Sequence, residues 1–109
     1  MEALHPTAAR ALLDDDPQAL LLDVREAWEM RLASPRVQAQ QWLQMPMASV
    51  PLRLDEIPKA QPIVCICHHG ARSAQVVAFL LQRGYSRVYN LAGGIEAWST
   101  HVDATVPRY

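Results

Sequence analysis

The sequence predicts an α/β fold in which helices flank a mainly parallel β-sheet. Two short apolar runs, residues 19–24 and 62–66, have the composition of strands that are buried on both faces. Segments with a helical pattern alternate with such runs along the chain, as they do in βαβ units. Half of the 109 residues are hydrophobic, so we expect one packed domain over residues 1–109.

The first half of the chain is expected to contain two strands and two helices. In chain order these are a short strand or extended arm at 4–6, a helix at 8–13, a strand at 19–24 and a helix at 25–31. Thr7 is a suitable N-cap for the first helix, and Pro17 follows its end. Glu26, Glu29 and Arg31 are expected to lie on a solvated face of the second helix.

The second half is expected to contain three strands and three helices. These are a strand at 42–45, a short helix at 50–57, a strand at 62–66, a helix at 73–83, a strand at 87–90 and a short helix at 95–99. Pro51 is tolerated in a first helical turn, and Gly84 suits a helix end. Residues 33–41 show no readable pattern, and residues 101–109 are expected to lie over the surface.

The candidate site is the segment between strand 62–66 and the helix after it: Cys67, His68, His69, Gly70, Ala71, Arg72 and Ser73. The amides of such a loop and the helix N-terminus direct partial positive charge at one spot, which favours a thiolate. Arg72 adds a full charge at the rim, and Gly70 permits a tight loop. We therefore expect the loop to hold an anionic sulfur and the anion with which it reacts.

The predicted fold places Cys67 where parallel sheets bind ligands, at the carboxyl end of a strand. Cys65, two residues earlier, points to the same face of the strand, which is poor geometry for a disulfide. We expect Cys65 to pack in the core and both thiols to be free, as in a reducing compartment.

Composition argues against several classes of partner. The net charge is −1 and no basic patch suggests nucleic acid. No segment approaches a membrane-spanning length, and the N-terminus lacks the features of a signal peptide. The expected location is the cytoplasm.

Three motifs together resemble the rhodanese domain. They are Leu21-Leu22-Asp23-Val24-Arg25-Glu26, then Cys67-x-x-Gly70-x-Arg72-Ser73, then Gly93-Gly94-Ile95-Glu96-Ala97-Trp98. The resemblance implies a five-stranded, mainly parallel sheet with helices on both faces, and it implies no cofactor. The closing Val106-Pro107-Arg108-Tyr109 is similar to that of small bacterial members.

The resemblance also implies a sulfurtransferase in which Cys67 carries a persulfide. The donor would be a small molecule such as thiosulfate, and the acceptor would be cyanide or a thiol, including a protein thiol. The backbone N–H groups of residues 68–73 would hold the persulfide and the donor. Arg72 would either bind the donor or brace the loop.

Two departures from the family pattern bear on this interpretation. Many active members have Arg directly after the cysteine, where this chain has His68, so thiosulfate would be attracted more weakly and a persulfide is the other candidate donor. Residues 37–41 replace the usual His-Ile-Pro-Gly-Ala-like stretch.

Two other functions are compatible with the motifs. One is a non-catalytic binding module of the same fold. The other is a cysteine-dependent phosphatase or arsenate reductase, although the Cys-x4-Arg spacing is one residue shorter than in the related phosphatases.

Asp23 and Arg25 are expected to give structural support, either through a buried Asp–Arg interaction or through backbone hydrogen bonds that hold neighbouring loops. Cys65, Cys67, His68 and His69 could be taken as a metal cluster. Zinc sites normally pair two separated couples of ligands, and the chain has no second couple, so we expect no metal.

Overall fold

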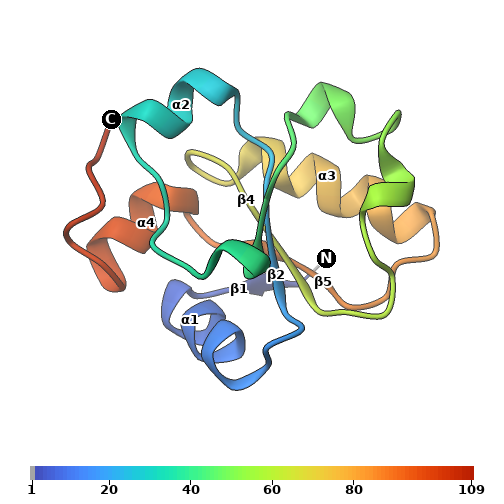
Figure 1. The fold of residues 1–109 in the computed structure, drawn as a ribbon, viewed down its shortest axis with the longest axis horizontal. Helices are drawn as coiled ribbons and strands as arrows, with labels where there is room; N and C mark the ends of the chain where they lie inside the picture. Colours follow the sequence, from blue (N-terminus) through green and yellow to red (C-terminus); the bar gives the residue numbers. More distant parts are fainter. Residues whose placement is uncertain (1) are drawn as a thin grey trace.

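The structure is a computed structural model that describes residues 2–109, and its strands form one parallel sheet (Figure 1). The five strands are β1 (Ala3–Leu4), β2 (Leu20–Asp23), β3 (Trp42–Gln44), β4 (Ile63–Ile66) and β5 (Val88–Leu91). Their order across the sheet is β1-β5-β4-β2-β3, and every neighbouring pair is parallel. The predicted fold class is confirmed, and β4 is the central strand.

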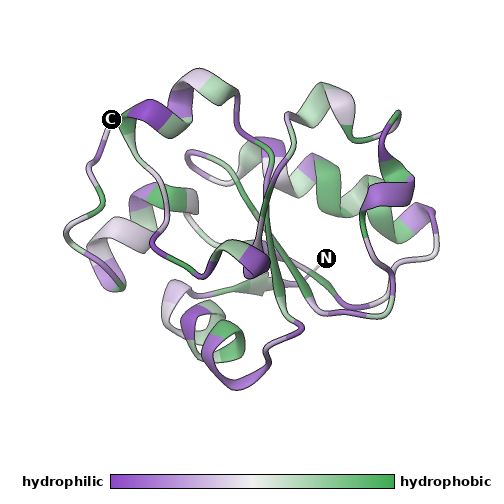
Figure 2. Ribbon diagram, in the orientation of Figure 1, coloured by the Kyte–Doolittle hydropathy of each residue, from purple (hydrophilic) through white to green (hydrophobic). Residues whose placement is uncertain are grey.

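Helices cover both faces of this sheet (Figure 1). Helices α1 (Pro6–Asp15) and α4 (Gly94–His101) lie on one face, and α3 (Ala71–Gln82) lies on the other. Within β2, Leu20 and Leu22 pack toward α3, whereas Leu21 packs toward α1 and α4. Because both faces are covered, the strand is apolar at every one of these positions, and Figure 2 shows hydrophobic residues along the central strands of the sheet.

The short helix predicted within residues 50–57 is present only as a 3₁₀ helix of three residues. The structure has two 3₁₀ turns in this region, η2 (Met47–Ser49) and η3 (Leu54–Glu56), joined by a tight turn. Several backbone bonds here span three residues, such as Val50 N–H to the Met47 carbonyl and Ile57 N–H to the Leu54 carbonyl. Pro51 has no N–H to donate, which interrupts any longer helical ladder.

Helix α1 begins earlier than predicted, and Thr7 is not its N-cap. His5 occupies that position, and its Nδ1 accepts a hydrogen bond from the Thr7 N–H at 3.2 Å. Pro6 is then the first helical residue, where the missing N–H costs nothing.

Other boundaries differ by one or two residues. The short helix α2 (Ala27–Leu32) starts after Glu26, and α3 starts at Ala71 because Gly70 is its N-cap. The region at 33–41, which showed no pattern, ends in a third 3₁₀ turn, η1 (Ala39–Gln41). Its buried Gln41 amide donates to the carbonyls of Leu13, Asp16 and Ala19, so a polar side chain fixes this connection.

The C-terminal segment is attached more firmly than predicted. His101 belongs to α4, and Val106 is buried in the core cluster beneath α1 and α4. The Ser99 hydroxyl donates to the Val106 carbonyl at 2.6 Å. Among residues 2–109, no helix combines the length and apolarity needed to cross a bilayer.

Candidate active site

Cys67 directly follows the central strand β4, and donors from the loop converge on its sulfur. The Gly70 N–H lies 3.0 Å from Sγ and the Ser73 N–H lies 3.4 Å from it. The Ser73 hydroxyl oxygen is also close, at 3.3 Å, but its proton is donated to Asn90 Oδ1. Gly70 has φ of +112°, a conformation that glycine adopts without strain and that turns the chain into α3. The loop therefore surrounds Sγ with hydrogen-bond donors, as suits a thiolate or persulfide.

The two cysteines have different surroundings although both are fully buried. Burial, followed by the neighbouring Cys67, raises the pKa of the Cys65 thiol, which holds it in the neutral form. Cys67 alone has the loop donors at its sulfur. Because Cys67 has no exposed surface, a donor can contact Sγ only after the atoms around it move.

The start of α4 holds the Cys67 loop from outside. The Ile95 N–H donates to the Cys67 carbonyl at 2.9 Å, and the Glu96 N–H donates to the His68 carbonyl at 3.2 Å. A Cβ at Gly94 would lie 2.4 Å from the His68 carbonyl oxygen. The approach of two backbones explains why glycine stands at this position in the Gly93-Gly94 motif.

Asn90, on β5, supports the other side of the loop. Its Oδ1 accepts from the Ser73 hydroxyl at 2.5 Å, and its Nδ2 donates to the Gly70 carbonyl at 3.2 Å. Sequence reasoning did not select Asn90; the only signal is a polar amide near the end of a predicted strand.

Arg72 pairs with Glu29. Nη1 and Nη2 of the guanidinium lie 2.7 and 2.8 Å from the two carboxylate oxygens. The sequence left two roles open for Arg72, and in this structure its guanidinium braces the loop against α2. The prediction of Glu29 on a solvated face is wrong, because Glu29 is only 3% exposed.

Two further donors fix the Glu29 carboxylate. The Tyr109 hydroxyl lies 2.7 Å from Oε1, and the Glu26 N–H lies 2.9 Å from Oε2. The hydrogen bonds from Arg72, and after them those from Tyr109 and Glu26, lower the pKa of Glu29 to about 2 despite burial. The three-residue spacing from Glu26 to Glu29 matches a helix capping pattern, and this was the available signal for Glu29.

Tyr109 reaches the site from the C-terminal segment. Its ring stacks on His68 with centroids 3.8 Å apart, and its hydroxyl accepts from Arg25 Nη1 at 3.1 Å. Burial and the hydrogen bond to Glu29 raise the pKa of Tyr109 to about 12, so the hydroxyl stays protonated and can donate. No local pattern in the sequence predicted this contact.

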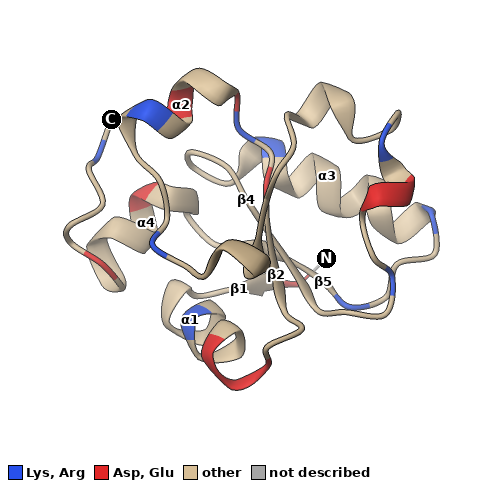
Figure 3. Cartoon of the chain, viewed as in Figure 1, with Lys and Arg blue, Asp and Glu red and all other residues tan. Residues whose placement is uncertain are grey.

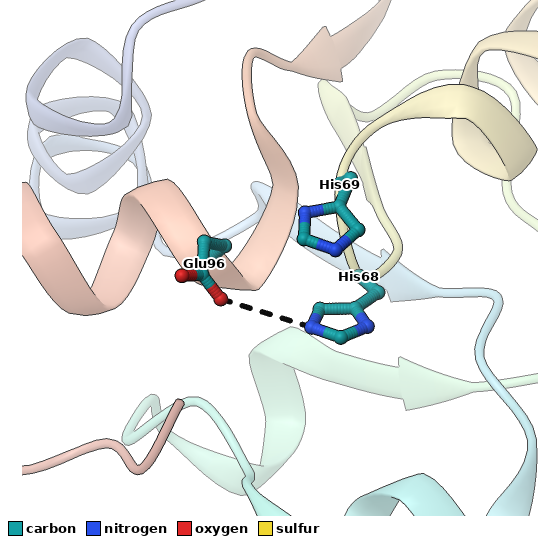
Figure 4. Close-up of side chains that lie close together, drawn as sticks. All are labelled: His68, His69 and Glu96. Atoms are coloured by element: carbon teal, nitrogen blue, oxygen red, sulfur yellow. Dashed lines mark ion pairs between the residues drawn. The ribbon is translucent and has the colours of Figure 1, made fainter. Parts of the chain in front are cut away.

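His68 and His69 stack on each other beside the loop, with centroids 3.9 Å apart. His68 is partly buried and His69 is exposed. His68 Nε2 lies 3.7 Å from Glu96 Oε2 (Figure 4), and Glu96 itself pairs with Arg108 at 2.7 Å. One nitrogen of each histidine and one Glu96 oxygen lie within 4.8 Å of one another, close enough to be considered as metal ligands. The expectation that the chain binds no metal stays a prediction.

Asp23 and Arg25 form a fully buried ion pair at 2.8 Å behind the site. Arg25 also donates to the Ala33 carbonyl at 3.0 Å, and the Trp42 indole N–H donates to Asp23 at 3.2 Å. These bonds join the end of β2 to the connection after α2 and to β3. Ala71 is exposed at the first position of α3.

The comparisons with known proteins agree on one family. Residues 5–101 match the rhodanese-like domain. The chain belongs to the rhodanese family. A sulfurtransferase of Allochromatium vinosum is 44% identical over 89 residues, which are 82% of this chain and 79% of that protein. The thiosulfate sulfurtransferase GlpE of Actinobacillus pleuropneumoniae is 30% identical over 95 residues, which are 87% of this chain and 83% of that protein.

Solved structures of other proteins share the fold. A rhodanese-like domain protein of Staphylococcus aureus has a TM-score of 0.81 at 24% identity, over 100% of this chain and 99% of that one. The polysulfide-sulfur transferase of Wolinella succinogenes has a TM-score of 0.79 at 27% identity, over 100% of this chain and 78% of that one. The chain is thus a rhodanese-family sulfurtransferase, as the sequence predicted.

Proposed function

We propose that Cys67 carries sulfur as a persulfide between a small donor and a thiophilic acceptor. The observation that supports this most directly is the pair of backbone N–H groups, from Gly70 and Ser73, that donate to the Cys67 sulfur. The sequence identity with a sulfurtransferase and with a thiosulfate sulfurtransferase supports the same chemistry.

The reaction has two transfers. The Cys67 thiolate attacks the outer sulfur of a donor such as thiosulfate, the S–S bond of the donor breaks, and sulfite leaves with the bonding electrons. The outer sulfur of the Cys67 persulfide is then attacked by cyanide or a thiol. This releases thiocyanate or a new persulfide and restores the thiolate.

The residues of the loop have distinct roles in this proposal. The N–H groups of residues 68–73 hold the negative sulfur and the oxygens of the donor. Arg72 braces the loop through Glu29, while Asp23 and Arg25 support the neighbouring connections. A thiol acceptor, either small or on a protein, fits a reducing cytoplasm, where Cys67 stays free.

The pairing of Arg72 favours sulfur transfer over phosphate chemistry. A phosphatase or arsenate reductase would use this guanidinium to bind an oxyanion, but both of its terminal nitrogens face Glu29. A binding module that only docks a partner has no need for donors at a cysteine sulfur.

Intact mass after incubation with thiosulfate tests the proposal. We expect the wild type to gain the mass of one sulfur atom and to lose it again on addition of cyanide, whereas Cys67→Ser gains nothing. Cys65→Ala is the control, since it removes the other buried thiol and should still be loaded.

Other outcomes separate the alternatives. A protein that accepts no sulfur from thiosulfate or a persulfide, and whose Cys67 resists alkylation, would contradict the proposal and favour the binding module. Sulfur gained equally by Cys67→Ser would place the carrier elsewhere.

A further inference from the structure

Each arginine side chain that contacts the site is already paired with a carboxylate. Arg72 binds Glu29, Arg25 binds Asp23, and Arg108 binds Glu96. The position after Cys67 is occupied by His68, whose Nε2 faces the same Glu96. Each of these three arginine charges is therefore neutralised by a carboxylate. Charges of both signs are spread along the chain (Figure 3).

The Arg72–Glu29 pair is held in place from the carboxylate side. Glu29 is 3% exposed and also accepts from the Tyr109 hydroxyl and the Glu26 N–H. Rotation of Arg72 toward a donor would leave a buried carboxylate without its principal partner, which is costly. Arg72 is thus unavailable as a counter-ion for an incoming anion.

The surface beside Arg72 is largely apolar. An open hollow of about 530 Å³ is lined by Val24, Glu26, Met47, Ala48, Pro51 and Arg72. Met47 and Pro51 also line an adjoining hollow of about 230 Å³ against α3. A substrate that approaches past Arg72 therefore meets apolar side chains and the Glu26 carboxylate, and no unpaired cation lines the hollow.

We propose that the preferred sulfur donor carries at most one negative charge and an apolar group R, as in R–S–SH or R–SO₂–S⁻, and that Glu29 sets this preference by neutralising Arg72. The inference rests on the proposed function and names the substrate class for the same cysteine. Glu29 acts here through Arg72, so it is a positioning residue.

Both kinds of donor, R–S–SH and R–SO₂–S⁻, transfer their outer sulfur by the same displacement. The Cys67 thiolate attacks the outer sulfur, the S–S bond of the donor breaks, and R–S⁻ or R–SO₂⁻ leaves with the electron pair. No oxidant or reductant is required. The donor differs from thiosulfate in having one negative charge fewer and an apolar group that can lie against Met47 and Ala48.

The test compares thiosulfate, methanethiosulfonate and benzenethiosulfonate with cyanide as the acceptor, measured as kcat/KM for thiocyanate release. The donors differ in intrinsic reactivity. This difference cancels when the ratio of kcat/KM for two donors is compared between the wild type and a variant. Glu29→Gln frees the Arg72 charge, so we expect it to raise kcat/KM for thiosulfate relative to benzenethiosulfonate by about 10-fold. Added salt should then reduce the thiosulfate rate of Glu29→Gln more steeply than that of the wild type.

Three further variants complete the design. Glu56→Gln is the matched control, since Glu56 forms an equivalent two-bond pair with Arg53 on the exposed surface, and it should leave the ratio unchanged. His68→Arg adds a cation while Glu29 keeps its hydrogen bonds from Arg72 and Glu26, and it should also favour thiosulfate. Met47→Gln should lower kcat/KM for benzenethiosulfonate relative to methanethiosulfonate.

The possible failures are distinguishable. If Glu29→Gln and His68→Arg both leave the donor ratio and its salt dependence unchanged, the inference is overturned while sulfur transfer by Cys67 stands. The inference is also overturned if Glu29→Gln lowers kcat/KM by the same factor for every donor while His68→Arg leaves the ratio of thiosulfate to benzenethiosulfonate unchanged. If no donor loads sulfur onto Cys67 in the mass measurement, the proposed function itself fails.

Discussion

At the scale of single residues, Tyr109 joins two parts of the site that are remote in sequence. Its ring packs on His68, and its hydroxyl links the Arg25–Asp23 pair to Glu29. A partly buried hydroxyl with two partners contributes through both bonds, and its removal leaves the partners less satisfied.

Tyr109→Phe should keep the stack on His68 and remove both hydrogen bonds. We expect it to reduce the free energy of unfolding by about 1–2 kcal/mol, and Tyr109→Leu to reduce it by about 1 kcal/mol more because the stack is lost too. Urea unfolding checks both values. Tyr89→Phe is the control, because within residues 2–109 the Tyr89 hydroxyl has no hydrogen-bond partner; equal losses at 89 and 109 would contradict the role of Tyr109.

At the scale of elements, the start of α4 acts as the outer wall of the Cys67 loop. Two backbone hydrogen bonds, from Ile95 and Glu96, attach the loop to this helix end. The contact leaves no room for a side chain at Gly94, which also has φ of +64°. The position of Cys67 is therefore set by a helix that follows it by more than twenty residues.

Gly94→Ala should disrupt the contact between the start of α4 and the Cys67 loop. The Cβ of the new alanine would lie 2.4 Å from the His68 carbonyl oxygen. We therefore expect the free energy of unfolding to fall by roughly 3 kcal/mol or more. We also expect Cys67 to be alkylated more slowly. Gly84→Ala is the matched control: φ is +91° there, but its Cβ would meet only the flexible end of Lys59 at 3.4 Å. We expect Gly84→Ala to lower the free energy of unfolding by about 1 kcal/mol and to leave the alkylation rate of Cys67 unchanged. Similar effects of the two substitutions would refute the steric argument.

At the scale of the whole molecule, paired carboxylates link stability to pH. The pKa of Glu29 is lowered to about 2 by Arg72 and its other donors. The pKa of Glu96 is lowered by Arg108, and that of Asp103 by Thr105. Because these groups bind protons more weakly in the fold than in the unfolded chain, their stabilisation is complete above their ordinary pKa values and is lost as pH falls.

Thermal melting of the wild type and Glu29→Gln between pH 7 and pH 2 tests this linkage. The ionised Glu29 should contribute on the order of 2–3 kcal/mol near pH 7, and this contribution should disappear between about pH 4.5 and pH 2. The wild type should therefore be the more stable protein at pH 7, with the gap closing in acid. A gap that is constant with pH would mean that Glu29 acts through packing alone.

The sequence by itself determined the fold class and the location of the candidate site. Apolar runs such as residues 19–24 indicate strands buried on both faces, because a covered strand has no solvated side. The Cys67 loop follows the clearest of these runs and precedes the clearest helix, so its place at a strand end follows from the local order of elements. The Gly93-Gly94 pair likewise predicted a turn, but it did not indicate that the turn packs against the His68 carbonyl.

Only the tertiary structure decided how the charges are used. Glu29, Asn90, Glu96 and Tyr109 reach the site from α2, β5, α4 and the C-terminal segment, and each one alone resembles an ordinary surface or core residue in sequence. The partner of a charged side chain is set by which elements meet, and a local pattern holds no information about that meeting. The sequence thus indicates a reactive cysteine, whereas the fold determines that the arginine beside it is already neutralised.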